Sequence, residues 1–91
     1  MASYKATNIN GADTTIISTV ACKLHSIVIN TTSGGAISVY DSASSATNPI
    51  AIFPTSAEVG TYIYDIDTKF GLTIVTAGTG DITVSTGSLG N

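Results

Sequence analysis

Turn-forming residues divide this 91-residue chain into short β-prone runs, and that spacing is the strongest constraint on its fold. The runs recur about every 8 to 12 residues, which is typical of β-sandwiches and barrels. Their Thr, Val, Ile and Tyr side chains suit a pleated sheet. The sequence therefore predicts strands near residues 2–9, 13–20, 22–31, 35–41, 49–54, 60–67, 70–77 and 80–86.

Glycine pairs and a polar loop separate these runs. Asn10-Gly11 and Gly34-Gly35 supply the positive φ values of tight hairpin turns, and residues 78–81 (Gly-Thr-Gly-Asp) are expected to join the last two strands into a hairpin. The stretch from Asp41 to Asn48 is the longest polar segment, and we expect an exposed loop there.

Two segments have the features of edge strands. Pro49 and Pro54 bracket residues 50–53, and proline cannot donate to a central ladder. Residues 1–9 alternate in a way that either adds an edge strand or forms an arm that pairs with a neighbouring subunit. Free edges attract partner strands.

The composition opposes both helix and nucleic-acid binding. Fifteen Thr and eleven Ser dominate the polar residues, Glu58 is the only Glu, and Gln and Arg are absent, although surface helices prefer Glu, Lys, Arg and Gln. The net charge is −3, and the three lysines do not cluster. A nucleic-acid partner would require a stripe of positive charge, so we expect none.

The chain is shorter than one average domain, so residues 1–91 are expected to form a single domain with a loose tail at 88–91. A domain this small usually requires disulfides, a metal or other subunits for stability. Cys22 is the only cysteine and His25 the only histidine, which excludes an intrachain disulfide and a Cys/His zinc site. Neighbouring subunits remain, and the sequence favours a homo-oligomer without cofactors.

The sequence contains neither a secretory signal pattern nor a membrane span. Residues 1–9 carry one Lys and no apolar core, and no apolar run approaches the roughly 20 residues of a spanning helix. We therefore expect no membrane partner and synthesis in the cytoplasm, where a lone thiol stays reduced.

Alternation of apolar residues predicts the core. Ile37 shares a face with Val39, Ile82 with Val84, and Phe70 with Leu72 and Ile74. Leu24 and Val28 oppose Ile27 and Ile29, so this strand is apolar on both faces and is expected to be central. Tyr62, Tyr64 and Ile66 share one face of their strand, and Ile63, Asp65 and Asp67 share the other. These patterns predict an all-β domain, a single small β-sandwich or jelly-roll-like barrel of about eight short antiparallel strands.

His25 is the first candidate for catalysis, but its neighbours do not support that role. A hydrolytic His requires a nucleophile and an orienting acid within hydrogen-bond reach. On a regular strand, Ser26 and Cys22 point to the face opposite His25. We therefore expect no enzyme and no catalytic residue.

The carboxylates give a weak cation signal. Asp65 and Asp67 share a strand face, about 7 Å apart, and Asp41 or Asp81 would complete a calcium site. Alternating acids on a strand usually form a solvated face, and no calcium-loop motif is present. Gly78-x-Gly80 likewise lacks the third glycine and the helix of a phosphate cradle. We expect no metal-binding residue.

The tyrosines and edge residues are the better candidates for partner contacts. Tyrosines on strands usually lie at the rim of the core, with the hydroxyl in water. Tyr40 is the strongest candidate because it faces away from Ile37 and Val39 and precedes the polar loop. The predicted contact residues are Tyr4, Tyr40, Asp41, Ile50 and Phe53.

A specific order of strands and turns runs from Lys23 to Ser85. It consists of a Leu-His strand at 24–30, a Gly-Gly turn, strands at 37–43, 49–52 and 60–62, and the ending Phe70 to Val84. This run resembles a group of small all-β virion proteins of tailed bacteriophages. The ending Gly71 to Val84 is its most specific element.

The resemblance implies a capsid decoration or cement protein. Such a protein would be a homotrimer, would bind the major capsid protein on the outer surface of the virion, and would stabilise the shell. The alternative is a receptor- or glycan-binding module of a head fibre or tail appendage, which would use Tyr40 and residues 41–48.

Overall fold

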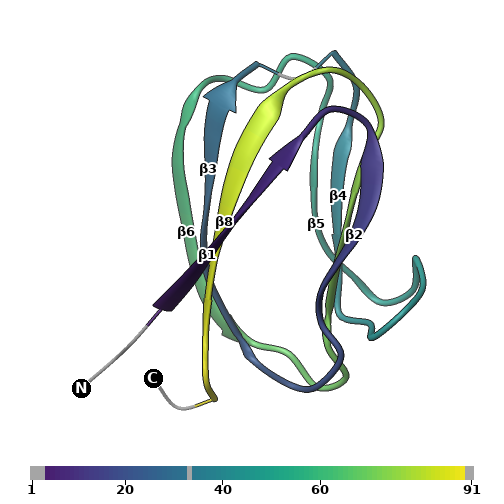
Figure 1. Ribbon diagram of the computed structural model, residues 1–91, viewed down its shortest axis with the longest axis vertical. Coiled ribbons are helices and arrows are strands. Elements are labelled where there is room, and N and C mark those ends of the chain that lie inside the picture. The colour runs from purple at the N-terminus through teal and green to yellow at the C-terminus, as the bar shows by residue number, and fades with distance from the viewer. Residues whose placement is uncertain (1–3, 33, 90–91) are drawn as a thin grey trace.

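The computed structural model describes residues 4–32 and 34–89, which form two four-stranded antiparallel sheets packed face to face (Figure 1). Sheet A contains, in spatial order, β1 (Tyr4–Asn10), β8 (Asp81–Gly87), β3 (Lys23–Thr31) and β6 (Gly60–Asp67). Sheet B contains β2 (Asp13–Ser18), β7 (Leu72–Thr76), β4 (Ile37–Tyr40) and β5 (Pro49–Phe53). All eight predicted strands are confirmed, with boundaries shifted by a few residues.

The strand orders β1-β8-β3-β6 and β2-β7-β4-β5 are those of an eight-stranded jelly roll, which consists of two Greek keys. The predicted all-β sandwich is therefore confirmed. In the described part of the chain, no helix is long and apolar enough to span a membrane.

The hairpins predicted at the glycine turns are wrong. Asn10-Gly11 joins β1 to β2, Gly34-Gly35 lies between β3 and β4, and residues 78–81 lead from β7 to β8, and in each case the two strands belong to different sheets. Gly11 does have a positive φ, of 84°. Gly35 has no positive φ and is required for another reason: an added Cβ would lie 2.7 Å from the Ala77 carbonyl carbon.

The core lies between the sheets and contains the predicted alternating residues. Ile37, Val39, Leu72, Ile74, Ile82 and Val84 are all fully buried there. Phe70 is not, because it precedes β7 and is 58% exposed. The carboxylate of Asp41 accepts hydrogen bonds from the backbone N–H groups of Lys69 and Phe70, which hold both residues outside the strand.

A bulge in β3 changes the face on which Leu24 lies. Against β8, Leu24 pairs with Thr86 and Ser26 pairs with Ser85, so His25 is one extra residue. Leu24 therefore joins Ile27 and Ile29 in the core, each with no exposed surface, and only Val28 remains on the other face. The predicted opposition of Leu24 to Ile27 and Ile29 is wrong, but the central position of β3 is confirmed.

Both predicted edge strands are edges. β5 borders sheet B, and β1 borders sheet A, where it pairs with β8 from Tyr4 to Asn10. The N-terminal run thus extends its own sheet. Residues 1–3 of that run lie outside the described residues, as do residues 90–91 of the predicted tail.

Candidate interaction surfaces

The outer faces of the two sheets differ in charge. The outer face of sheet A carries Lys23, His25, Asp65, Asp67 and Asp81 in its exposed rows. The outward rows of sheet B contain only uncharged residues. The two faces therefore differ in the charge that they expose.

His25, Asp65 and Tyr4 form a cluster on the outer face of sheet A. The imidazole Nδ1 of His25 lies 2.6 Å from a carboxylate oxygen of Asp65. The Tyr4 ring stacks on the imidazole with a centroid distance of 4.1 Å and an interplanar angle of 15°. The cluster joins β1, β3 and β6, and sequence reasoning missed it because the partners are far apart in the chain.

The backbone at this cluster is irregular in both strands. Opposite the extra residue His25, β6 also gains a residue, since Leu24 pairs with Ile66 whereas Ser26 pairs with Ile63. Asp65 has a φ of 50°, in the left-handed region that non-glycine residues rarely adopt. The two irregularities place the imidazole and the carboxylate in contact.

This pair is only part of a catalytic arrangement. Asp65 occupies the position of an acid that orients His25, and no residue near His25 in the sequence could supply such an acid. The Cys22 thiol lies in the core, where it is 3.6 Å from the Thr68 hydroxyl. The ring of His25 therefore contacts an acid, and the nearby thiol of Cys22 is engaged with Thr68 inside the core.

The carboxylates considered for calcium are dispersed over the molecule. Asp65 contacts His25, and Asp67 lies 3.8 Å from the Lys23 ammonium. Asp81 accepts a hydrogen bond from the side-chain amide of Asn8 at the other end of the face. No group of three or more His, Cys, Asp or Glu residues that could hold a metal occurs within residues 4–32 and 34–89.

The paired rows on the outer face of sheet B are uncharged, and isoleucines are their most exposed large side chains. One row across the sheet runs from Ile16 through Thr73 to Tyr40, and the next runs from Thr14 through Val75 and Ser38 to Ile52. Ile16 is 47% exposed and Ile52 is 62% exposed. We call these seven residues the apolar face.

Four of the five predicted contact residues are divided among three environments. Tyr40 lies on the apolar face, half-buried, and Tyr4 lies in the His25 cluster on the other sheet. Ile50 is half-buried against the core. Phe53 is only 7% exposed because it pairs with Ile37 on the inner face of β5, so Ile52 is the exposed apolar side chain of this strand.

Asp41 holds two segments together. Its carboxylate accepts hydrogen bonds from Lys69 N–H and Phe70 N–H at 2.9 to 3.0 Å. Partial burial raises the pKa of Asp41, but the backbone hydrogen bonds from residues 69–71 and the Lys69 charge outweigh it and lower this pKa below its ordinary value. These bonds occupy the carboxylate, which leaves it little capacity for a ligand.

The loop that follows Asp41 is closed at its base. Asp41 N–H donates to the Asn48 carbonyl, and the Asn48 side-chain amide donates back to the Asp41 carbonyl. Ser42 is buried, and its hydroxyl accepts a hydrogen bond from Ser45 N–H. Residues 44–48 are exposed, as predicted.

Tyr62 and Tyr64 support the rim of the core. Their rings lie 5.0 and 6.2 Å from the ring of Phe53. The Tyr62 hydroxyl donates to the Glu58 carbonyl. The pKa of Tyr64 is raised, mainly by burial and to a smaller extent by the neighbouring Tyr62, so its phenol stays neutral.

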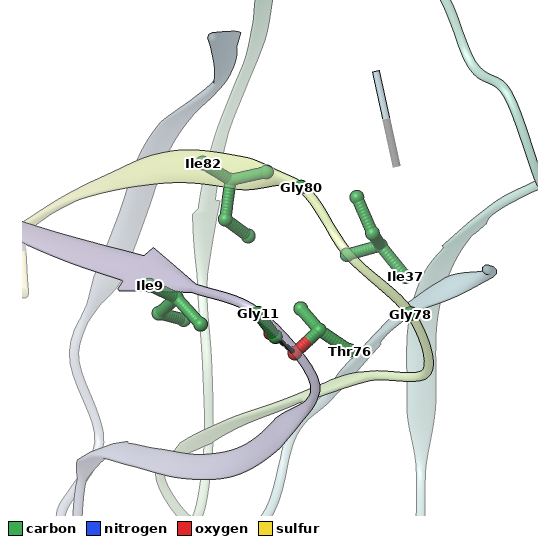
Figure 2. Close-up of a pocket in the computed structure, with 7 residues that line it drawn as sticks. All are labelled: Ile9, Gly11, Ile37, Thr76, Gly78, Gly80 and Ile82. Carbon is green, nitrogen blue, oxygen red and sulfur yellow. Dashed lines mark hydrogen bonds between the residues drawn. The ribbon is translucent and has the colours of Figure 1, made fainter. Parts of the chain in front are cut away.

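Two hollows formed by the described residues differ in the space that they enclose. The first, at the end where the β1–β2 and β7–β8 loops meet, leaves no space for a water-sized molecule. There, Thr76 Oγ1 donates to the Gly11 carbonyl (Figure 2). The second is an open depression of about 380 Å³ at the opposite end, and Lys5 is its one charged lining residue.

Comparison of the chain with protein-family models, with curated proteins and with solved structures gives no match.

Proposed function

We propose that this domain is a non-enzymatic structural protein of a bacteriophage particle, which binds the outer surface of the capsid through its apolar face and stabilises the shell. The observation that carries the proposal is the uncharged outer face of sheet B, with exposed Ile16 and Ile52 near its two borders. The resemblance of residues 23–85 to small virion proteins supports the capsid as the partner.

The chemistry of the apolar face suits permanent packing against another protein. Burying a large apolar side chain contributes about 1.5 to 3 kcal/mol, and Ile16 and Ile52 still expose much of their surface. Their neighbours Thr14 and Ser38 lose little side-chain entropy on burial. Thr73 is already fully buried and donates to the Ser42 carbonyl, so this part of the face needs no reorganisation.

The outer face of sheet A is a poorer docking surface. Covering it would remove the Lys23–Asp67 ion pair and the Asp65 carboxylate from water. Desolvating paired charges costs free energy that their mutual attraction often does not recover. We therefore assign this face to the solvent side of the particle.

Co-sedimentation with capsids that lack this protein tests the proposal, and two isoleucines provide a matched pair of variants. Ile52 is 62% exposed on edge strand β5 of the apolar face, and Ile63 is 65% exposed on edge strand β6 of the other face. Ile52→Lys is expected to weaken capsid binding at least about tenfold, because it buries an unpaired charge. Ile63→Lys is expected to bind as the unmodified protein does.

Equal binding by both variants, or a selective loss with Ile63→Lys, would contradict this assignment. A glycan array with the same protein is the second readout. Reproducible glycan binding that disappears in Tyr40→Ala would favour a receptor-binding module of a fibre or tail appendage instead.

A further inference from the structure

Among the four edge strands of the described sandwich, β1 alone keeps an unbroken register with its neighbour. The edge at β6 is interrupted by the bulge at Asp65 and carries Asp67. In sheet B, β2 has a register shift between Ile16 and Ser18, and β5 begins with a proline and is also shifted against β4. Bulges, prolines and charges are the usual means by which proteins block strand addition, and β1 lacks the first two.

The hydrogen-bonding groups on the free side of β1 follow from its pairing with β8. Gly11 N–H, just beyond β1, donates to the Gly80 carbonyl, so residues of the same parity (Lys5, Thr7 and Ile9) direct their backbone groups toward β8. Ala6, Asn8 and Asn10 direct theirs away from the sheet. This outward row is a template for one more antiparallel strand.

We propose that β1 pairs antiparallel with β1 of a second copy of this chain, about a twofold axis at Thr7. Only residues with outward backbone groups can exchange hydrogen bonds across the new pair. A register centred on Thr7 satisfies this condition, since Ala6 faces the partner's Asn8 and Tyr4 faces the partner's Asn10. It also pairs all seven residues of β1, which no shifted register does.

The side chains of β1 suit pairing with themselves. Lys5 is the only charged residue of the strand, and the register places it opposite the partner's Ile9 instead of the partner's Lys5. Like charges directly opposite would be destabilising. The remaining opposed pairs are uncharged. The product is a continuous eight-stranded sheet made from the two copies of sheet A.

The geometry of this dimer also affects how the protein would contact a shell, an inference that rests on the proposed function. A twofold axis between antiparallel strands is perpendicular to the sheet, so both copies of sheet B lie on the same side. Both apolar faces then point in one direction, and a dimer would contact a shell at two places. This isologous contact closes with two subunits and therefore replaces the trimer that the resemblance implies.

The mass of the 91-residue chain in solution, measured by light scattering over a series of concentrations, tests the pairing. We expect a dimer for the unmodified chain and for Ala6→Val. We expect a folded monomer for Ala6→Pro, which removes an outward N–H and leaves the bonds to β8 intact. Circular dichroism checks that the proline variant is folded. A monomeric unmodified chain, or an undiminished dimer in a folded Ala6→Pro variant, would overturn the proposal.

Cysteine cross-linking tests the register independently. In the proposed pair, the two copies of residue 7 face each other directly at a distance that a disulfide spans. Thr7→Cys is therefore expected to form a covalent dimer on oxidation, and Asn8→Cys, which is offset from its own copy, is not. The unmodified chain controls for Cys22, which is buried. Equal cross-linking at the two positions would exclude this register.

The capsid assay separates this inference from the proposed function. If the dimer forms but does not bind capsids, the proposed function fails and the pairing stands. If the protein binds capsids as a monomer, the pairing fails and the function stands. If both hold, the folded Ala6→Pro monomer should bind at least about tenfold more weakly, because it loses the second contact.

Discussion

His25 and Asp65 are in contact because two neighbouring strands are irregular at the same level. The extra residue in β3 is His25 itself. Opposite it, β6 has two residues, and one of them, Asp65, has a positive φ. The resulting contact of 2.6 Å joins side chains that are 40 positions apart in the sequence.

Two replacements of Asp65 separate the effect of its positive φ on stability from the effect of its hydrogen bond to His25. Both Asp65→Ala and Asp65→Gly lose the contact with His25, but only glycine adopts a φ of 50° without a steric penalty. We expect the glycine variant to exceed the alanine variant by about 1 kcal/mol in free energy of unfolding, measured with urea. Inside a regular strand the order would be reversed, so an advantage for alanine would contradict the observed conformation.

Leu24 and Val28 test the bulge in β3. Leu24 is fully buried and Val28 only partly, although regular alternation would place both on one face. Leu24→Ala is expected to cost about 2 to 5 kcal/mol, because it opens a cavity in the core. Val28→Ala should cost about 1 kcal/mol or less. Equal costs in urea denaturation would indicate a strand without the bulge.

Gly71 is predicted to be irreplaceable for steric reasons. An added Cβ would lie 2.5 Å from the Ser18 carbonyl oxygen and 2.9 Å from Ala43 Cα, and both are backbone atoms. Gly60 has nearly the same φ, and nothing lies within 4 Å of its added Cβ. Both alanine variants are expected to carry the backbone strain of a positive φ, about 1 to 3 kcal/mol, and Gly71→Ala is expected to cost about 1 to 3 kcal/mol more because of the steric clash. The melting temperatures of the two variants measure the difference.

Asp41 should make the stability depend on acid. Its folded pKa lies below the ordinary value of 3.8, so its contribution is complete above that value and is lost as the pH falls through the folded pKa. Asp41→Asn is expected to cost about 1 kcal/mol at neutral pH, a modest figure because solvent screens the carboxylate.

The difference between the Asp41→Asn variant and the unmodified chain should shrink as the pH falls below 3.8, in urea titrations at several pH values. Glu58→Gln, at an exposed position, controls for the general effect of removing a negative charge. A difference that does not change with pH would show that the ionisation of Asp41 is not involved.

Apart from the bulge in β3, local sequence patterns were sufficient for the elements and for most of the core. The strand ranges and the inner positions of Ile37, Val39, Ile82 and Val84 follow from alternation and turn residues alone. Local patterns gave the wrong side-chain positions for Leu24 and Phe70. A bulge adds one residue that no side-chain pattern records, and the Phe70 turn depends on hydrogen bonds to Asp41, 29 positions earlier.

The interaction surfaces were only partly accessible to sequence reasoning. Tyr40 was placed correctly on an outward face, because alternation within one strand is sufficient for that. The choice of Phe53 over Ile52 could not be corrected from the sequence, since either residue of β5 could face inward until pairing with Ile37 fixes the register. The His25–Asp65 contact likewise requires knowledge of which strands are neighbours.

The amino-acid sequence by itself determined that this chain forms about eight short strands in a small sandwich, because strand formation depends on side chains and turns that are close in the chain. Only the tertiary structure decided that the glycine turns cross between sheets and that the strands take the jelly-roll order. It also decided which sheet face is free of charge. These features depend on pairing between residues far apart in the chain, which local preferences do not specify.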